Sequence, residues 1–204
     1  WDSNDLTSVI ELCAQNIDDF EGTVTPMSLT CILDRLRHYC RANTRAGSRR
    51  NIAAHYDLGN AFYSQWLDPS MTYSAARFVT DEDNLTDAQA NKFDSLASML
   101  NLQDGDHVLE IGCGWGAFAI HIASKYKCRV TALTVSPAQA EWARQKVADA
   151  GLTDRVEIRL QDYRDVEGQF DKIASIEMFE AVGEEYWPVF FETVSKRLRA
   201  GGLA

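Results

Sequence analysis

The sequence lacks a long hydrophobic segment and an excess of positive charge. No run approaches the roughly 20 apolar residues that a membrane-spanning helix needs, and no signal peptide is recognisable. Across 204 residues, 20 Lys and Arg are outnumbered by 30 Asp and Glu, which gives a formal net charge of −10. Proteins that bind nucleic acids generally use basic surfaces. The composition therefore argues against a nucleic-acid partner.

The cysteines lack the pairing expected of a zinc site or a disulfide framework. There are five of them, and no two form a C-x-x-C pair. We therefore expect reduced thiols in a cytoplasmic protein without a bound metal. Hydrophobic residues make up 46% of the chain and charged residues 25%, as in ordinary globular proteins. The length allows one sizeable α/β core and an appendage.

The segment from Val108 to Gly116 predicts a cofactor site. The mainly apolar run 108–111 indicates a buried parallel strand, and glycines follow at 112, 114 and 116. Glycines at such a junction allow a tight turn and a close approach of the backbone to a ligand. A helical pattern begins at Ala117, and the free N–H groups of a helix start attract an acidic group. A nucleotide-like cofactor is therefore expected there.

Two classes of cofactor can be considered for this turn. The letters of residues 112–117 fit G-x-G-x-x-A, which also occurs in dinucleotide-binding folds. That class needs an acid near the end of the second strand, and the predicted strand 129–135 has none. Glu110, just before the glycines, is instead the usual opening of an S-adenosylmethionine motif. The methyltransferase interpretation is therefore favoured.

The rest of the second half alternates between strand and helix patterns. We predict strands at 108–111, 129–135, 156–161 and 172–177, with helices at 117–126, 137–149 and about 185–199. Such alternation predicts a parallel sheet with helices on both faces and a ligand at the carboxyl ends of its strands. Gly201 and Gly202 predict a helix-stop turn, followed by the first residues of another strand. We expect a doubly wound, mostly parallel, Rossmann-like α/β sheet, truncated after its fourth strand and the following helix.

The first half predicts helices and an aromatic segment. A short amphipathic helix is expected from Asn4 to Asn16, capped by Asn4 or Asp5. Another helix is expected after residue 85, with Thr86 and Gln89 as a capping box. We predict an N-terminal helical segment over residues 1–50, an aromatic cover over 51–85, and an incomplete cofactor-binding domain over 86–204.

A second helix is expected from about residue 28 to residue 44. It places Arg37, Arg41 and Arg45 beside its apolar face, at intervals of four residues. Two interpretations remain open: a solvated helix face, or attraction to anionic lipid headgroups.

Residues 51–78 are rich in aromatic side chains and follow no clean period. This composition suits a cover over an apolar cavity, although ordinary aromatic packing would give the same pattern.

Several of these segments, in this order, resemble the cyclopropane-fatty-acyl-phospholipid synthases and the mycolic acid cyclopropane synthases. The resemblance covers roughly residues 50 to 202. Its motifs are HYDLGN at 55–60, LDPSMTYS at 67–74, EIGCGWG at 110–116, LTVS at 133–136, QDYRD at 161–165 and SIEMFE at 175–180.

The resemblance implies an S-adenosylmethionine-dependent enzyme. Its cofactor-binding set would be Glu110, Gly112 and Gly114 at the methionine part, Tyr73 and Ser74 over the carboxylate end, Thr134 and Gln139 at the ribose, Asp162 and Tyr163 at the adenine, and Ile176 at the catalytic face.

The resemblance also implies the reaction. Methyl transfer to the cis double bond of an unsaturated phospholipid acyl chain would create a carbocation, and loss of a proton would close a cyclopropane ring. Bicarbonate would take the proton, and Glu180 would orient it as the catalytic residue. The alternative for Glu180 is a carboxylate at a helix entry. The enzyme would be cytoplasmic and associated peripherally with the inner face of the membrane, with a homodimer left open.

One departure from the family pattern concerns the product. The family usually has Cys after the Tyr-Ser pair, whereas Ala75 follows Ser74 here. A related fatty-acid methyltransferase that forms a methyl- or methylene-branched chain would have almost the same sequence. A methyltransferase for another small apolar substrate and a non-catalytic lipid- or cofactor-binding relative also stay open.

Overall fold

The computed structural model describes residues 5–16 and 59–204. The chain divides into two units, residues 1–42 and 43–204. The first unit contains α1 (Leu6–Gln15), which confirms the first predicted helix. Asp5 caps it, because its Oδ1 accepts a hydrogen bond of 3.1 Å from the backbone N–H of Ser8. The predicted basic helix lies outside the described residues. So does the aromatic segment up to residue 58, and the description resumes at Gly59.

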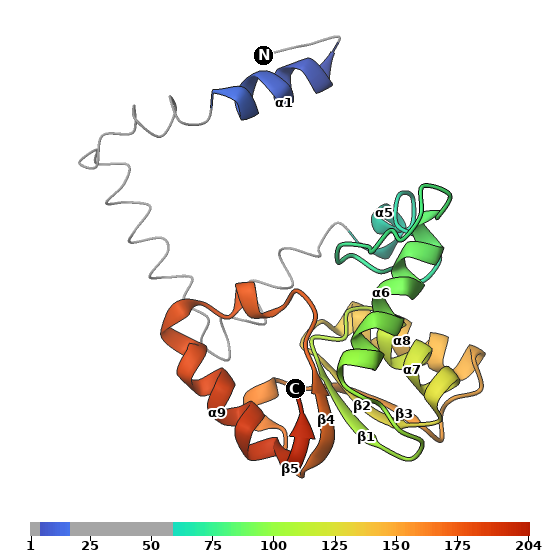
Figure 1. The fold of residues 1–204 in the computed structure, drawn as a ribbon, viewed down its shortest axis with the longest axis vertical. Helices are drawn as coiled ribbons and strands as arrows, with labels where there is room; N and C mark the ends of the chain where they lie inside the picture. Colours follow the sequence, from blue (N-terminus) through green and yellow to red (C-terminus); the bar gives the residue numbers. More distant parts are fainter. Residues whose placement is uncertain (1–4, 17–58) are drawn as a thin grey trace. The chain divides into compact units, whose positions relative to one another are not determined.

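The second unit is built on a parallel sheet with the strand order β3-β2-β1-β4-β5 (Figure 1). All four strand pairings are parallel. The order runs one way from β1 to β3 and the other way from β1 to β5, so a crevice is expected where it reverses, beside β1. The strands are β1 (His107–Ile111), β2 (Arg129–Thr134), β3 (Val156–Leu160), β4 (Phe170–Ala174) and β5 (Leu198–Leu203).

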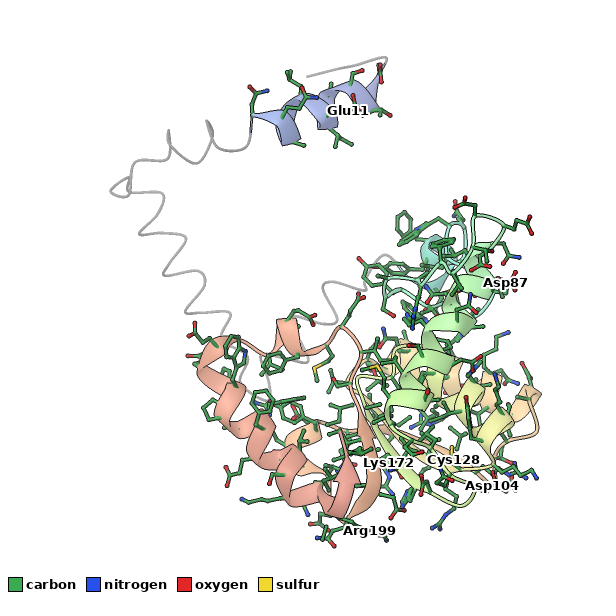
Figure 2. All side chains as sticks on the ribbon, in the orientation of Figure 1. Glu11, Asp87, Asp104, Cys128, Lys172 and Arg199 are labelled. Atoms are coloured by element: carbon green, nitrogen blue, oxygen red, sulfur yellow. The ribbon has the colours of Figure 1, made fainter. Side chains whose placement is uncertain are left out.

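Helices cover both faces of this sheet, which confirms the doubly wound architecture (Figure 1). One face packs against α6 (Leu85–Met99), α7 (Ala117–Tyr126) and α8 (Pro137–Asp149), and the other against α9 (Trp187–Arg197). Within β1, Val108 belongs to the first core and Leu109 to the second, because successive side chains of a strand point to opposite faces. Figure 2 shows side chains filling the space on both sides of the sheet.

The end of the chain differs from the prediction. Strand β5 follows α9 at once and pairs with β4, so the sheet has a fifth strand. Gly201 and Gly202 therefore lie within a strand rather than in a helix-stop turn. A Cβ at Gly202 would lie 2.7 Å from the carbonyl oxygen of Asp171, so glycine allows the two strands to approach. The strand expected to begin after the two glycines thus begins before them, at Leu198.

The fourth strand also ends earlier than expected. The predicted range was 172–177, but β4 ends at Ala174. A loop follows, then the short 3₁₀ helices η2 (Phe179–Ala181) and η3 (Glu184–Tyr186). The apolar residues 176, 178 and 179 suggested more strand because periodicity does not distinguish a strand end from an apolar loop.

The predicted capping box of α6 is wrong. The helix begins two residues earlier than a Thr86 cap would require, and Asn84 caps it by accepting a 3.0 Å hydrogen bond from the backbone N–H of Asp87. Gln89 is buried and bonds elsewhere, since its Nε2 donates to the carbonyl oxygen of Ser74 at 2.9 Å.

No helix in the described part of the chain is long and apolar enough to cross a bilayer.

Gly116 makes a close contact that should be measurable. Its φ is +89°, and a Cβ there would lie 3.0 Å from the Cβ of Ala143 in α8. Gly168 has nearly the same φ, +90°, but a Cβ added there would meet no atom within 4 Å. Left-handed backbone costs an L residue about 1–2 kcal/mol, and overpacking adds about 1–3 kcal/mol.

We therefore expect Gly116→Ala to lower the free energy of unfolding by about 2–5 kcal/mol, whereas Gly168→Ala should lower it by only about 1–2 kcal/mol. Urea denaturation of the two variants measures both values. Equal losses would show that the contact between Gly116 and α8 has no energetic weight.

Candidate functional site

A cavity of about 460 Å³ lies at the carboxyl ends of β1 to β4. All ten predicted cofactor contacts line it: Tyr73, Ser74, Glu110, Gly112, Gly114, Thr134, Gln139, Asp162, Tyr163 and Ile176. The structure thus brings together segments that are far apart in the sequence. Glu180 is exposed and is not among the lining residues, although its neighbours Ala181 and Val182 are.

The floor of the cavity is the glycine turn between β1 and α7. Gly112 has a φ of +84° and Gly114 a φ of +53°, which glycine adopts without a Cβ penalty. The backbone N–H groups of Gly112 and Cys113 both donate to the carbonyl oxygen of Leu133, at 3.0 and 2.8 Å. A Cβ at Gly112 would lie 2.7 Å from Cγ of Met178. The turn therefore requires glycine at residue 112, as the sequence predicted.

Glu110 is a buried acid at the end of β1. Its side chain lines the cavity, and its Oε2 has no hydrogen-bond partner within the described structure. Burial raises the pKa of Glu110 to about 8, while a hydrogen bond from the backbone N–H of Ala119 acts in the opposite direction. A cationic group in the cavity would offset the burial of this carboxylate. The site therefore suits a ligand with an ammonium group.

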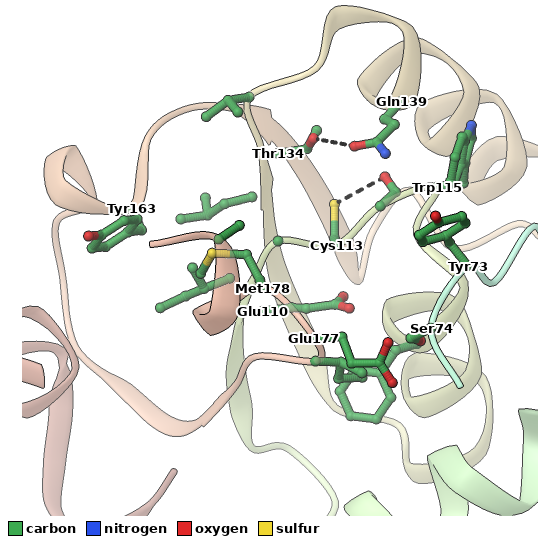
Figure 3. A pocket seen from close by; sticks show the side chains of 18 of the residues that line it. Tyr73, Ser74, Glu110, Cys113, Trp115, Thr134, Gln139, Tyr163, Glu177 and Met178 are labelled. Carbon is green, nitrogen blue, oxygen red and sulfur yellow. Dashed lines mark hydrogen bonds between the residues drawn. The ribbon is translucent and has the colours of Figure 1, made fainter. Parts of the chain in front are cut away.

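Thr134 and Gln139 form a buried polar pair (Figure 3). The hydroxyl of Thr134, at the end of β2, donates to Oε1 of Gln139 at 2.8 Å. Ser136 caps α8 by accepting a hydrogen bond of 3.3 Å from the backbone N–H of Gln139. The cap fixes the first turn of α8 beside the cavity. The pair can exchange hydrogen bonds with hydroxyl groups of a ligand.

Asp162 and Tyr163 follow β3. Asp162 is buried and pairs with Arg164 through two contacts, Nε to Oδ1 at 2.8 Å and Nη2 to Oδ2 at 2.6 Å. Such a bidentate pair fixes the carboxylate. Burial raises the pKa of Tyr163, whose ring packs edge-on against Phe190 at 5.4 Å. Arg164 also lines the cavity and was not expected there.

The segment over the cavity is held by α6. Gln89 donates from Nε2 to the carbonyl oxygen of Ser74, and Nζ of Lys92 donates to Oγ of Ser74 at 2.6 Å. Burial lowers the pKa of Lys92 to about 8, against the charges of Glu177 and Asp68. These side chains fix Ser74 at the cavity wall.

Aromatic rings pack beside this segment. Tyr63, in the short helix α5 (Asn60–Tyr63), is buried against Trp115 of the glycine turn, with ring centroids 5.3 Å apart. Tyr73 is about half exposed and meets Tyr63 edge-on at 5.7 Å. The indole N–H of Trp115 donates to Oδ1 of Asn60 at 2.8 Å. The described part of the aromatic segment therefore packs directly on the glycine turn.

Glu177 lines the cavity, and its role was not predicted. Its Oε1 accepts a hydrogen bond of 2.9 Å from the backbone N–H of Ala75, and its φ is +45°. Neither feature could be found from the sequence, because a non-glycine residue with positive φ has no local signature and Ala75 is 102 residues away.

The buried acid predicts a pH dependence of stability. The folded protein holds a proton on Glu110 up to about pH 8, whereas an ordinary Glu loses it near pH 4.5. The contribution of this group to stability is therefore complete below pH 4.5 and is lost as the pH rises toward 8, by at most about 1.4 kcal/mol per pH unit.

Glu110→Gln should remove this dependence, so the variant should gain stability relative to the wild type between pH 5 and pH 8. Urea denaturation across this range measures the difference. Glu184→Gln, at an exposed site, is the matched control. A constant difference between the wild type and Glu110→Gln would contradict the raised pKa.

Comparison with known proteins agrees with this geometry. The model of the mycolic acid cyclopropane synthetase family matches residues 43–204. The tuberculostearic acid methyltransferase UfaA1 of Mycobacterium tuberculosis is 41% identical over 213 aligned residues, which cover 99% of this chain and 48% of the relative. The cyclopropane-fatty-acyl-phospholipid synthase of Escherichia coli K12 is 42% identical over 149 residues, which cover 73% of this chain and 38% of the relative.

A solved structure has the same fold. The crystal structure of mycolic acid cyclopropane synthase CmaA1 complexed with SAH and CTAB matches with a TM-score of 0.72 and 37% identity, over 74% of this chain and 53% of that one. The chain spans less than half the length of the two curated relatives. The family match covers most of the chain, including every predicted site residue. The chain therefore belongs to the mycolic acid cyclopropane synthetase family.

Proposed function

We propose that the cavity binds S-adenosylmethionine. The observation that supports this most strongly is the unpartnered Oε2 of Glu110, a buried acceptor facing a cavity that can hold an ammonium group. The glycine turn and the Thr134–Gln139 pair add a close backbone approach and buried groups for ribose hydroxyls. SAH is present in the CmaA1 structure, whose chain is 37% identical.

Each lining residue then has a distinct task. Glu110 would hold the ammonium group and release its own proton as the cofactor binds, because a cation lowers the pKa of a neighbouring carboxyl. Asp162, fixed by Arg164, and Tyr163 would lie against the adenine. Tyr73 and Ser74 would cover the carboxylate end. S-adenosylmethionine supplies an electrophilic methyl group when bound.

We further propose an unsaturated phospholipid acyl chain as the methyl acceptor, with a cyclopropane ring as the product. Two observations support a lipid: the named lipid-modifying relatives and the apolar side chains of Ile176, Met178 and Val182 in the cavity wall. An isolated alkene is a weak nucleophile, so these side chains would align it and exclude water.

A branched product is the second candidate. It is favoured by the 41% identity to a protein named tuberculostearic acid methyltransferase and by Ala75 at the position where the family usually has Cys. The two candidates share the cofactor site and differ in how the acyl chain loses its proton.

Loss of that proton requires an acceptor. The family resemblance implies a bicarbonate ion near Ile176, oriented by Glu180. Ile176 lines the cavity and Glu180 does not, so the catalytic role of Glu180 and the presence of bicarbonate stay predictions.

Incubation of the full-length protein with S-adenosylmethionine and vesicles of monounsaturated phospholipid tests the function. We expect the acyl chains to gain the mass of one methylene unit and to show cyclopropane signals in NMR. A mass gain without ring signals would favour the branched product. Cofactor binding in calorimetry without any mass gain would favour a non-catalytic relative and contradict the proposal.

We also propose a peripheral association with the inner face of the cytoplasmic membrane, with a homodimer left open. It rests on the sequence pattern of Arg37, Arg41 and Arg45, which lie outside the described residues. Arginines near an anionic surface contribute about 1 kcal/mol each.

Replacing the three arginines with Gln should therefore weaken co-sedimentation with anionic vesicles, most clearly at low salt, where charges are screened least. Zwitterionic vesicles are the control, and binding to them should not change. Equal sedimentation of the variant and the wild type with anionic vesicles would leave a solvated helix face as the explanation.

A further inference from the structure

Three carboxylates line the cavity in the described part of the chain, and they differ in their partners. Glu110 is buried and suits a cationic ligand, and Asp162 is neutralised by Arg164 at 2.6 Å. Glu177 is exposed at the cavity wall, and its Oε1 accepts from the backbone N–H of Ala75. A single neutral donor leaves a carboxylate its charge and its remaining lone pairs. Glu177 is therefore the lining carboxylate best able to accept a proton.

The backbone of Glu177 supports a functional reason for this residue. Its φ of +45° is in the left-handed region, which favours glycine and is unfavourable for a long side chain. Strain of this kind persists at sites where the surrounding structure enforces it, and such sites are often functional. Here it directs the carboxylate to Ala75 while Met178, the next residue, packs over Gly112.

Glu177 lies close to the segment that carries Ser74 and Ala75. Figure 3 shows its carboxyl group near Ser74, on the side where Glu110 is seen. Lys92 is close enough that the charge of Glu177 raises its pKa, in opposition to burial, and its Nζ binds Ser74. Glu177 belongs to the loop after β4, and its carboxylate is thus held against the segment that covers the cavity.

We propose that Glu177 is the catalytic proton acceptor of this site. The inference rests on the proposed function. Alkylation of an alkene leaves a positive charge on the acyl chain. To close the ring, a C–H bond of the transferred methyl group breaks and its electron pair forms a C–C bond from the methyl carbon to the cationic carbon. To give an alkene instead, a C–H bond on a carbon adjacent to the cationic carbon breaks and its electron pair forms the C=C bond. In either case the proton moves to a carboxylate oxygen of Glu177.

The position of Glu177 suits both parts of this step. A carbocation loses a proton readily, so the placement of the acceptor matters more than its basicity. A negative charge beside the cavity also stabilises the cationic acyl chain. Because Glu177 is exposed, the proton can pass on to water. The N–H of Ala75 already has an anionic partner in this chain, so a free anion such as bicarbonate is not required.

The test compares Glu177→Gln and Glu177→Gly with a matched control, Glu184→Gln, an exposed acid that does not line the cavity. Glutamine keeps the size of the side chain, and glycine removes the backbone strain, so at least one variant should fold. Three readouts apply to the full-length protein: calorimetric binding of S-adenosylhomocysteine, lipid products by mass spectrometry, and the chemical shift of the Ala75 amide in NMR.

We expect both variants to bind S-adenosylhomocysteine as the wild type does. Product formation should fall by about 100-fold or more, with hydroxylated chains appearing as water captures the cation. Formate should restore activity to Glu177→Gly, because it can occupy the space left beside the Ala75 N–H. The amide signal of Ala75 should shift in Glu177→Gln and Glu177→Gly, and it should keep its wild-type position in Glu184→Gln.

Three results would each overturn the inference alone. They are full activity of Glu177→Gln, loss of wild-type activity when bicarbonate is removed, and an Ala75 amide signal that does not change on substitution of Glu177. Absence of methyl transfer by the wild-type protein would instead overturn the proposed function and the inference with it.

Discussion

The buried carboxyl of Glu110 is the constraint on which the cofactor site depends. A carboxylate without a charged partner is costly in an apolar interior, so the free protein keeps a proton there and its pKa is raised to about 8. The group is fixed by its place on the central strand β1, between β2 and β4, where it cannot turn toward water. A cation bound in the cavity would offset most directly the cost of burying this carboxylate. Sheet topology, glycine turn and ligand preference are therefore linked through one side chain.

Much of the fold could be predicted because its signals are local. The residues of β1 at 108, 109 and 111 are apolar because both faces of this strand are covered. The glycines at 112, 114 and 116 have positive φ values, which other residues adopt only with strain. The ten predicted cofactor contacts follow from strand ends and from the family resemblance, and all ten residues line one cavity. Helix starts with a strong cap, such as Ser136 before α8, were placed correctly.

The wrong predictions concern residues whose structure is determined by contacts with distant parts of the chain. Gln89 matches a capping box by spacing, but its amide bonds to the cover segment, so Asn84 caps α6 instead. Gly201 and Gly202 have the pattern of a turn, yet both lie in β5, which pairs with β4. The hydrogen bond of Glu177 to Ala75 could not be predicted, since it depends on a strained φ and on a partner that the whole fold brings near. Glu180 was chosen by family pattern, and its side chain is outside the cavity lining.

The attachment of the cover to α6 has a consequence for sequence variation. Gln89 donates to the carbonyl oxygens of Thr72 and Ser74, and Phe93, one turn further along α6, packs in the core. A carbonyl oxygen is present whatever residue occupies the position, so these two bonds do not depend on the side chains of the cover. Mutations can therefore change the cover over generations while α6 keeps it in place.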